Sequence, residues 1–313
     1  MPSQANHPLP TGFQLEGYRI ARKLSQGGFS IVYLAHDEAG TPVAIKEYLP
    51  SSLALRQAGE TEPKVTQTHQ AAFRYGMKCF FEEGRALAKL SHPNLVRVLN
   101  FFRANQTVYM VMRYERGRTL HEHIHKHKGE LRETFIRGVF TRLLNGLREV
   151  HTHRLLHLDI KPANVYLRSD GTPMLLDFGA ARQAIACDEP MLKPMYTPGF
   201  AAPEQFTHKD ALGPWTDIYS VGASIYSALG SGAPQPANKR LERDNLVPAV
   251  ERWAGRYSYQ LLETVDWCLE LDHLARPQSV FTLQKALSSR MPEDPGSTWL
   301  DSLRSRLGSM VAK

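Results

Sequence analysis

The chain has 313 residues, of which 42% are hydrophobic and 22% charged, a composition that is typical of a globular protein and excludes disorder throughout. No run of about 18 apolar residues occurs, and Met1 to Pro10 has no apolar stretch after a basic start, so we expect neither a membrane span nor a secretory signal and predict a cytoplasmic protein. The three cysteines form no Cys-x-x-Cys pair and the net charge of +7 is scattered, which argues against a disulfide framework, a zinc site and a nucleic-acid partner.

The first predicted elements are a polar leader and a group of strands. Residues 1–14 contain proline and show no periodicity, so we expect a mobile leader. Tyr18 to Leu24 and Ile31 to Ala35 alternate as strands do, and the small residues between them predict a hairpin turn. A third strand, Val43 to Lys46, ends in a lysine that needs an acidic partner if it is buried.

A long insertion at residues 47–72 separates this strand from a helix pattern that runs from Phe73 to Leu90. The insertion contains a small hairpin flap. It is either a tolerated surface loop or a regulatory or docking element beside the helix. Val98 to Phe102 and Val108 to Met112 are two more strand patterns, and they complete a five-stranded antiparallel sheet.

A histidine cluster follows the strands. His121 and His125 would share one helix face, and His123 and His127 another, which raises the hypothesis of a metal site. No cysteine or acidic cluster completes such a site, so a solvated helix is the favoured interpretation. Residues 135–151 then form a long amphipathic helix pattern.

The stretch from His157 to Gly179 concentrates side chains that suit phosphoryl transfer. Such a transfer needs little covalent help from a protein but much positioning and charge neutralisation. Asp159 can orient an attacking hydroxyl and accept its proton, and Lys161 can reach the transferring phosphate from the same loop. Asn164 and Asp177 offer oxygen ligands of the kind that Mg²⁺ prefers, and a predicted hairpin would hold them facing one another.

The loop sequence His-Leu-Asp-Ile-Lys-Pro-Ala-Asn and the later Asp-Phe-Gly resemble the catalytic and magnesium loops of protein kinases. Val43-Ala44-Ile45-Lys46 and the segment from Thr197 to Glu204 match two further motifs of that family, in order along the chain. The resemblance covers about Tyr18 to Leu287 and is strongest to bacterial eukaryotic-like Ser/Thr protein kinases. It implies an α+β, bilobal protein kinase fold with a five-stranded antiparallel β N-lobe, an αC helix and a mainly α-helical C-lobe.

The resemblance also implies the domain boundaries. The kinase domain would span residues 15–287, with the N-lobe at 15–112, the hinge at 113–117 and the C-lobe at 118–287. Residues 288–313 would form a tail with a short amphipathic helix. That helix would dock on its own lobe or on a partner, or touch a membrane surface.

An ATP site between the lobes follows from the resemblance. Lys46, held by Glu83, would bind the phosphates, and the adjacent Glu82 is the alternative acid. The Gly-rich loop departs from the family pattern, because serines stand where the first and third glycines would be. Arg113 likewise replaces the acid that is usual at its position. The residues implied to line the nucleotide are Ser25, Gly27, Gly28, Val32, Ala44, Met112, Arg113, Glu115 and Tyr166.

Thr197 would bond Asp159 and Lys161, which by resemblance indicates Ser or Thr rather than Tyr as the acceptor. Leu158 replaces the arginine that pairs with an activation-loop phosphate in many kinases, and residues 180–196 contain no Ser or Thr. We therefore expect activity without phosphorylation of that loop. Structural roles are implied for further residues: His157 and Phe178 in the spine that links the lobes, Asp217 as a cap of the catalytic loop, and Glu204 with Arg276 as a buried ion pair.

The sequence thus predicts a Ser/Thr protein kinase that uses ATP with Mg²⁺ or Mn²⁺ and acts on protein substrates, and family habit adds a cognate protein phosphatase. A pseudokinase-type nucleotide-binding scaffold is one alternative. Such a scaffold would usually lack Lys46, Asp159, Asn164 or Asp177. A small-molecule kinase of the aminoglycoside or choline type is the other, and the peptide-binding segment that ends in Ala-Pro-Glu disfavours it.

Overall fold

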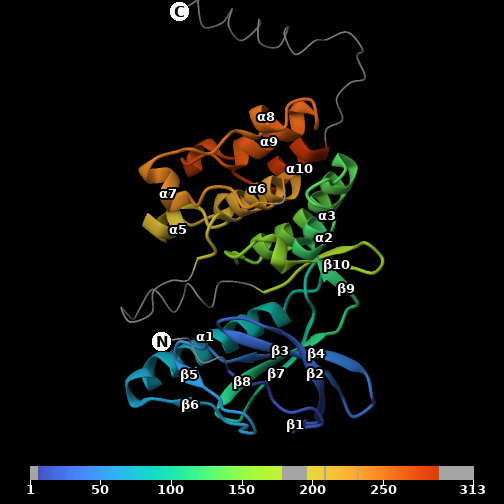
Figure 1. Cartoon of the computed structure of the whole chain (residues 1–313), viewed down its shortest axis with the longest axis vertical. Helices are drawn as coiled ribbons and strands as arrows, with labels where there is room; N and C mark the ends of the chain where they lie inside the picture. The colour runs from blue at the N-terminus through green and yellow to red at the C-terminus, as the bar shows by residue number, and fades with distance from the viewer. Residues whose placement is uncertain (1–5, 178–195, 208, 231, 289–313) are drawn as a thin grey trace, which may run out of the picture.

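The computed structural model describes residues 6–177, 196–207, 209–230 and 232–288, and it has two lobes (Figure 1). A β-sheet with one long helix forms the lower lobe, and the upper lobe consists mainly of helices. Buried hydrophobic side chains from both lobes belong to one connected core. This architecture confirms the predicted α+β, bilobal kinase fold.

The N-lobe sheet has six antiparallel strands in the order β1-β2-β3-β4-β8-β7. Side chains alternate between buried and half-buried along β3, as expected of a strand with two different faces. Five of the strands are those predicted, and a two-residue strand, β1, adds the sixth. The bounds are β1 Gln14–Leu15, β2 Tyr18–Gln26, β3 Ser30–His36, β4 Pro42–Tyr48, β7 Val98–Ala104 and β8 Thr107–Arg113.

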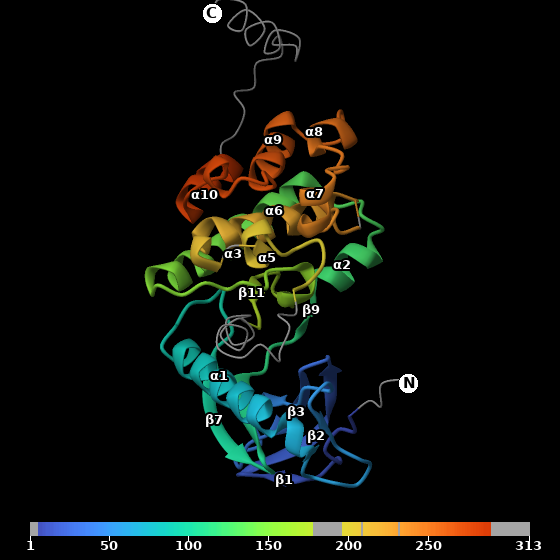
Figure 2. The same ribbon diagram turned by 90° about the vertical axis from the view of Figure 1, so that its left-hand side faces the viewer.

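Helix α1 (Gln70–Ala88) lies across this sheet and contacts β7 and β8 (Figure 2). Its buried side includes Phe73, Phe80 and Leu87. A glycine inside a helix costs about 1 kcal/mol relative to alanine, so Gly76 needs a packing reason. A Cβ at Gly76 would collide with the hydroxyl of Tyr48. The glycine therefore allows α1 to approach the end of β4.

Residues 6–13 pack against the sheet together with the insertion. Asn6 and Leu9 are 4% and 3% exposed, and the Asn6 side-chain oxygen accepts a hydrogen bond from the backbone N–H of Arg56 at 2.6 Å. The predicted flap is present as β5 (Ala54–Leu55) paired with β6 (Lys64–Val65), and the short helix η1 (Gln67–His69) follows it. The expectation of a mobile leader is wrong for residues 6–14, because they bury an apolar side chain and satisfy polar groups of the insertion. Residues 1–5 lie outside the described part of the chain.

A buried ion pair anchors the insertion to β4. The Arg56 guanidinium contacts the Glu47 carboxylate at 2.5 and 2.7 Å, and neither side chain is exposed. The hydroxyls of Tyr33 and Tyr109 each donate a hydrogen bond to the same carboxylate at 2.7 Å. Burial raises the pKa of both tyrosines, which keeps them neutral donors. The carboxylate is thus neutralised and hydrogen-bonded where an unpaired charge would be costly.

The C-lobe contains a small three-stranded sheet in the order β11-β10-β9 and a set of helices around α6. Helix α6 is buried on all sides from Thr216 to Leu229, so it forms the centre of the lobe. The strands are β9 Gly117–Thr119, β10 Val165–Arg168 and β11 Pro173–Leu175. The helices are α2 Leu120–Lys126, α3 Glu133–Thr152, η2 Pro162–Asn164, α5 Pro203–Thr207, η3 Lys209–Ala211, α6 Pro214–Gly230, α7 Ala237–Glu242, α8 Ala249–Arg252, α9 Tyr259–Cys268, η4 His273–Ala275 and α10 Val280–Ser288.

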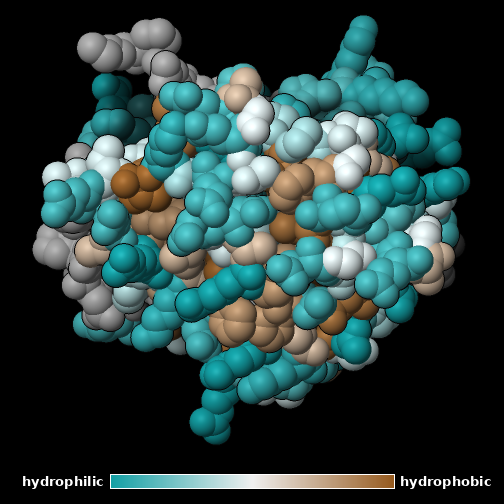
Figure 3. Space-filling model, turned by 90° about the horizontal axis from the view of Figure 1, so that it is seen from below, coloured by the Kyte–Doolittle hydropathy of each residue, from teal (hydrophilic) through white to brown (hydrophobic). Residues whose placement is uncertain are grey.

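Viewed from the N-lobe end, the surface is mostly hydrophilic, with hydrophobic side chains in patches between polar ones (Figure 3). In the described part of the chain, none of the helices combines the length and the apolar character needed to cross a membrane. The predicted tail helix, at residues 299–311, lies outside the described residues.

Candidate active site

Three side chains of the predicted catalytic machinery, those of Lys161, Asn164 and Thr197, meet at the carboxylate of Asp159. The ammonium of Lys161 lies 3.0 and 2.9 Å from its two oxygens, and the Thr197 hydroxyl donates a hydrogen bond to Oδ1 at 2.8 Å. Lys161 also donates to the Thr197 hydroxyl at 2.8 Å. The Asn164 amide nitrogen donates to Oδ2 at 2.9 Å. Residues separated by up to 38 positions therefore converge on one carboxylate, which is 8% exposed.

Asp217, at the start of α6, holds the backbone of the catalytic loop. Its carboxylate accepts hydrogen bonds from the backbone N–H groups of His157 and Leu158 at 2.9 and 2.7 Å and contacts Nε2 of His151 at 2.8 Å. Burial alone would raise the pKa of Asp217, but the hydrogen bonds from His151 and from the backbone N–H of His157 lower it overall. Leu158 has a φ of 63°, a left-handed conformation that is strained for a leucine. The buried, ionised carboxylate stabilises this turn.

His157 is fully buried beneath the loop. Its Nε2 lies 2.9 Å from the carbonyl oxygen of Leu176, and its Nδ1 is 3.3 Å from the backbone N–H of Asp159. These contacts assign the proton to Nε2, because Nδ1 must accept. Burial holds the pKa of His157 below its ordinary value, against the opposing influence of Asp217 and Asp159. The imidazole is therefore neutral and positions Asp159. Phe178, its predicted neighbour in the spine, lies outside the described residues.

Lys46 reaches the site from β4, and its ammonium contacts Oδ1 of Asp177 at 2.9 Å. The structure does not have the predicted pairing of Lys46 with Glu83. Within the described residues no ion pair joins the two side chains, although Glu83 is buried on the side of α1 that faces the lobe interior. The aromatic ring of Phe80, one turn from Glu83, lies 5.6 Å from the ammonium.

Asn164 and Asp177 have the donor chemistry that the predicted magnesium site requires. Both hydrogen bonds of the Asn164 side chain use its amide nitrogen, to the backbone oxygen and to the carboxylate of Asp159, so the amide oxygen remains for a cation. The strand pair β10–β11 joins the two residues, with Val165 opposite Leu175, as the predicted hairpin requires. An amide oxygen and a carboxylate are hard ligands that fit Mg²⁺.

The four histidines of α2 and its C-terminal cap form two ring pairs. His121 packs on His125 with ring centroids 4.3 Å apart, and His123 packs on His127 at 4.2 Å, which confirms the shared helix faces. Among the residues that the structure describes, no group of three or more His, Cys, Asp or Glu side chains could hold an ion.

The strand register places Val32, Ala44, Lys46 and Met112, four of the residues predicted at the nucleotide site, on one face of the sheet. Val32 lies opposite Lys46 and Ala44 lies opposite Met112, and paired residues of antiparallel strands share a face. Arg113 lies opposite Val43 and so belongs to the other face. This explains why an arginine can replace the usual acid there. Only the backbone of that position faces the predicted adenine site.

Tyr166 and Glu115 approach each other at the hinge. Tyr166 lies on β10, where it pairs with Thr119, and its hydroxyl donates a hydrogen bond to the carbonyl oxygen of Glu115 at 3.2 Å. Burial raises the pKa of Tyr166. Its ring is thus held beside the hinge in the position that was predicted to contact adenine.

The Gly-rich loop is held by the N-terminal segment and the insertion. The carbonyl oxygen of Gly28 accepts hydrogen bonds from the backbone N–H and the hydroxyl of Ser51 at 2.9 and 3.2 Å. The Gln26 side chain donates to the carbonyl oxygen of Asn6 at 2.7 Å. Within the loop, Gly27 N–H donates to Ser30 at 2.9 Å, and Ser25 pairs with Val32 across the hairpin. Sequence reasoning missed the role of Ser51, since no local pattern marks it.

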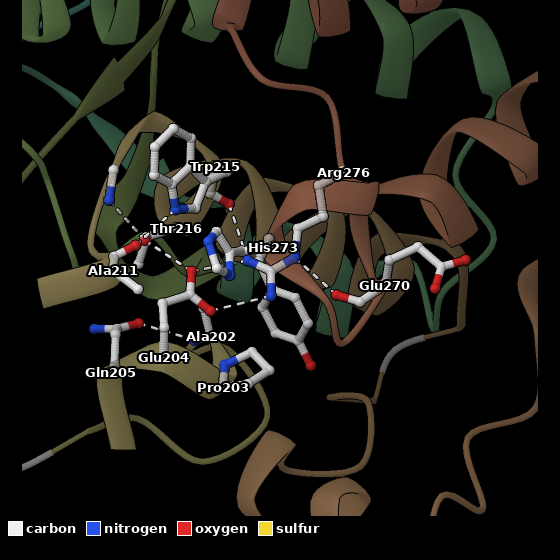
Figure 4. Close-up of polar contacts among 12 residues, drawn as sticks. Ala202, Pro203, Glu204, Gln205, Ala211, Trp215, Thr216, Glu270, His273 and Arg276 are labelled. Carbon is white, nitrogen blue, oxygen red and sulfur yellow. Dashed lines mark hydrogen bonds and ion pairs between the residues drawn. The ribbon is translucent and has the colours of Figure 1, made fainter. Parts of the chain in front are cut away.

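The segment that ends in Ala-Pro-Glu-Gln is fixed by buried polar contacts (Figure 4). Arg276 donates to both carboxylate oxygens of Glu204 at 2.9 and 3.0 Å, and the Thr216 hydroxyl donates to the same carboxylate at 2.8 Å. This is the predicted ion pair. Gln205 adds a contact that was not predicted, because its side chain donates to the carbonyl oxygen of Leu158 at 3.2 Å. The segment that carries Thr197 is thereby connected to the catalytic loop.

Comparisons with known proteins agree with this geometry. The family model of the protein kinase domain matches residues 18–289. Serine/threonine-protein kinase B of Synechocystis sp. is 29% identical over 232 residues, which are 70% of this chain but only 37% of that protein, so the chain spans little more than a third of this relative. The solved structure of the apo form of PpkA-294 is 34% identical, with a TM-score of 0.82, and the match covers 90% of this chain and 99% of that one.

The kinase domain of PknI from Mycobacterium tuberculosis is more distant. It is 21% identical, with a TM-score of 0.68, and the match covers 90% of this chain and 98% of that one. This likeness concerns the fold. Since the family model matches most of the sequence and the fold agrees, the chain belongs to the protein kinase family.

Proposed function

We propose that this chain is a Ser/Thr protein kinase that transfers the γ-phosphate of ATP to Ser or Thr hydroxyls of protein substrates. The observation that carries the proposal is the convergence of Lys161, Asn164 and Thr197 on the Asp159 carboxylate. A pseudokinase scaffold has no need for this arrangement. The contact between Thr197 and Asp159 also supports a protein acceptor, because it joins the peptide-binding segment to the base.

Asp159 acts as the base that orients the acceptor hydroxyl and takes its proton. Its carboxylate is buried and restrained by three side-chain donors, so it needs little reorganisation before reaction. Lys161 lies beside it and offsets negative charge that develops on the transferred group. Thr197 fixes the lysine relative to the base. Lys46 binds phosphate oxygens once it leaves Asp177.

Asn164 and Asp177 would hold Mg²⁺, or Mn²⁺ in its place. The ion supplies charge neutralisation at the phosphates. Asp177 contacts Lys46 in this structure, so ion binding competes with that contact. Binding of nucleotide and metal would then separate Lys46 from Asp177 and let Glu83 pair with the lysine.

The segment at residues 180–196 contains no Ser or Thr, and Leu158 offers no cation for a phosphate there. We infer that activity does not depend on phosphorylation of this segment. Thr197, the first Ser or Thr after this segment, has its hydroxyl bonded to Asp159 and Lys161, which supports this inference. Residues 178–195 themselves lie outside the described part.

The test incubates purified protein with labelled ATP, Mg²⁺ and a generic basic protein, in parallel with Asp159→Ala. We expect label on serine and threonine of the acceptor with wild type, and none with the variant, while both bind ATP. ATP binding without transfer by wild type would support the scaffold instead. Label on an aminoglycoside or choline rather than on protein would support a small-molecule kinase.

A further inference from the structure

Two adjoining cavities border the hinge and share Arg168 as a wall. The first, of about 310 Å³, is also lined by Arg97, Arg113 and the side of the hinge that carries Glu115. The second, of about 480 Å³, is also lined by Arg118 and Lys126. None of the proposed catalytic or metal-binding side chains lines either cavity.

Positive charge dominates both walls. We call the set Arg97, Arg113, Arg118, Lys126 and Arg168 the basic hinge surface. Glu115 is the one acidic residue that lines either cavity, and it lies 3.6 Å from Arg168. The only other carboxylate that pairs with Arg168 in the described part belongs to Asp170, which is 3.9 Å from Nε and mostly exposed. Five cations thus face two carboxylates.

The charges at the second cavity repel one another. Burial lowers the pKa of His123, and the nearby charges of His127, Arg118 and Lys126 lower it further, with no acid in opposition. In addition, Nε of Arg168 is buried and has no hydrogen-bond acceptor among the described residues. Four of the five cations are exposed, so an anion can reach them and would offset both their mutual repulsion and the missing acceptor at Nε of Arg168.

The second cavity also has an apolar wall. Leu167 and Phe135 line it, and the ring of Phe135 stacks on that of His123 with centroids 4.7 Å apart. An apolar wall beside cations suits a polypeptide segment, whose acidic side chains alternate with carbon-rich ones. A free phosphate ion would use the charges and leave the wall in water.

We propose that the basic hinge surface is a docking site for an acidic segment of a polypeptide substrate, with carboxylate or phosphate groups in the two cavities. The proposal rests on the proposed protein kinase function for the identity of the partner as a substrate. Discrete cavities that share one arginine favour a polypeptide over nucleic acid, which would require a continuous track of phosphate contacts.

Docking away from the chemistry has a defined kinetic signature. An acidic segment tethered to the acceptor raises the local concentration of the acceptor at Asp159 without changing the chemical step. The acidic segment should therefore lower KM and leave kcat unchanged. Added salt should reduce this advantage, because exposed charges are screened over about 8 Å at physiological ionic strength.

The kinetic test compares two acceptor peptides that differ only in a flexibly linked run of glutamates, in both wild type and Arg118→Glu/Lys126→Glu. These two residues are exposed and belong to no part of the proposed catalytic machinery. We expect the glutamates to lower KM about tenfold for wild type and to give no advantage with the variant. The kcat/KM for the peptide without the glutamates should differ by no more than about twofold between wild type and the variant. The matched control, Arg142→Glu/Lys239→Glu, changes the same charge elsewhere on the C-lobe and should behave as wild type.

A binding test separates this proposal from the kinase proposal, because it uses a labelled glutamate-rich peptide that lacks Ser, Thr and Tyr. Fluorescence anisotropy should show binding to wild type and to the control variant, and about tenfold weaker binding to Arg118→Glu/Lys126→Glu. A phosphoserine version of the peptide shows whether phosphate is preferred to carboxylate, and both preferences agree with the proposal. Equal binding of the peptide by all three proteins would overturn the docking proposal. Binding of RNA at this surface, without binding of the peptides, would also overturn it. Peptide binding without any phosphate transfer would retain the docking site and reject the kinase.

Discussion

Thr197 shows at the scale of one residue how the site depends on distant parts of the chain. Its hydroxyl donates to Asp159 and accepts from Lys161, both at 2.8 Å. The resemblance of the sequence to kinases predicted this pair of contacts. The geometry adds that the hydroxyl is shared between a buried acid and a cation, so its loss leaves both with one contact fewer.

We predict that Thr197→Val lowers kcat about 10- to 100-fold, because each hydrogen bond to a charged group is worth about 1.5–3 kcal/mol. Thr197→Ser keeps the hydroxyl and should retain most of the activity. Steady-state kinetics at saturating ATP measures the difference, and ATP affinity should be the same in all three proteins. A valine variant as active as wild type would remove Thr197 from the proposed machinery.

His157 makes the stability of the fold depend on pH. Burial lowers the pKa of its imidazole, so below an ordinary pKa of about 6.5 the unfolded chain binds a proton that the folded chain rejects. The free energy of unfolding should therefore decrease as pH falls through about 6.5, by at most about 1.4 kcal/mol per pH unit from this residue.

The measurement is urea denaturation of wild type and His157→Gln between neutral and mildly acidic pH. Glutamine can place an amide N–H near the position of Nε2 but does not titrate in this range. The variant should show a smaller loss of stability with falling pH. Parallel pH profiles for the two proteins would mean that another group causes the dependence.

The Lys46 partner was the residue-level prediction that the structure changed. Sequence reasoning gave Lys46 two possible partners on the helix, with Glu83 preferred to Glu82, and it assigned Asp177 to the metal. The choice between a helix acid and a loop acid depends on side-chain and loop conformations, which periodicity does not encode. The structure selects Asp177.

At the scale of elements, the strands were predictable because their side chains alternate, and the catalytic hairpin because apolar runs flank a turn. The packing of residues 6–13 against the sheet and the insertion was not predictable from such patterns. Their burial depends on Asn6 meeting Arg56, fifty positions later, and on Leu9 meeting the Tyr33 hydroxyl. Such long-range polar contacts leave no local pattern, so a Pro-containing polar segment is interpreted as mobile.

We predict that Arg56→Met destabilises the fold by about 3–5 kcal/mol, because it leaves the buried Glu47 carboxylate without its cation. The double variant Glu47→Gln/Arg56→Met also removes the negative charge of residue 47, so it should recover part of the lost free energy of unfolding. Chemical denaturation gives both values. If the single variant were no less stable than the double, the ion pair would not be what fastens the insertion to β4.

For the whole molecule, the order of motifs along the chain was enough to predict two lobes with the site between them. The resemblance also implied the ion pair of Glu204 with Arg276, but no sequence pattern marked the contact of Gln205 with the catalytic loop. The segment after Thr197 is held by Glu204 to Arg276 and by Gln205 to the catalytic loop, so the C-lobe keeps its substrate side in place through buried contacts. Leu158 and the absence of Ser and Thr at 180–196 then suggest that this arrangement needs no phosphate.

We therefore predict that treatment with a broad-specificity protein phosphatase, followed by its removal, leaves the initial rate of the first turnovers within about twofold of the untreated protein. Mass spectrometry verifies that phosphate has been removed. A lag that ends as the protein rephosphorylates itself would instead point to activation by phosphorylation, at a residue other than those of segment 180–196.

The most direct measurement for the account as a whole is single-turnover transfer from ATP by wild type and Asp159→Asn under saturating Mg²⁺, with ATP affinity measured on the same preparations. Asparagine preserves the shape of the side chain but cannot take a proton. The account predicts equal ATP affinity and a transfer rate that is about 10²- to 10⁴-fold lower in the variant. Equal transfer rates in the two proteins would contradict it.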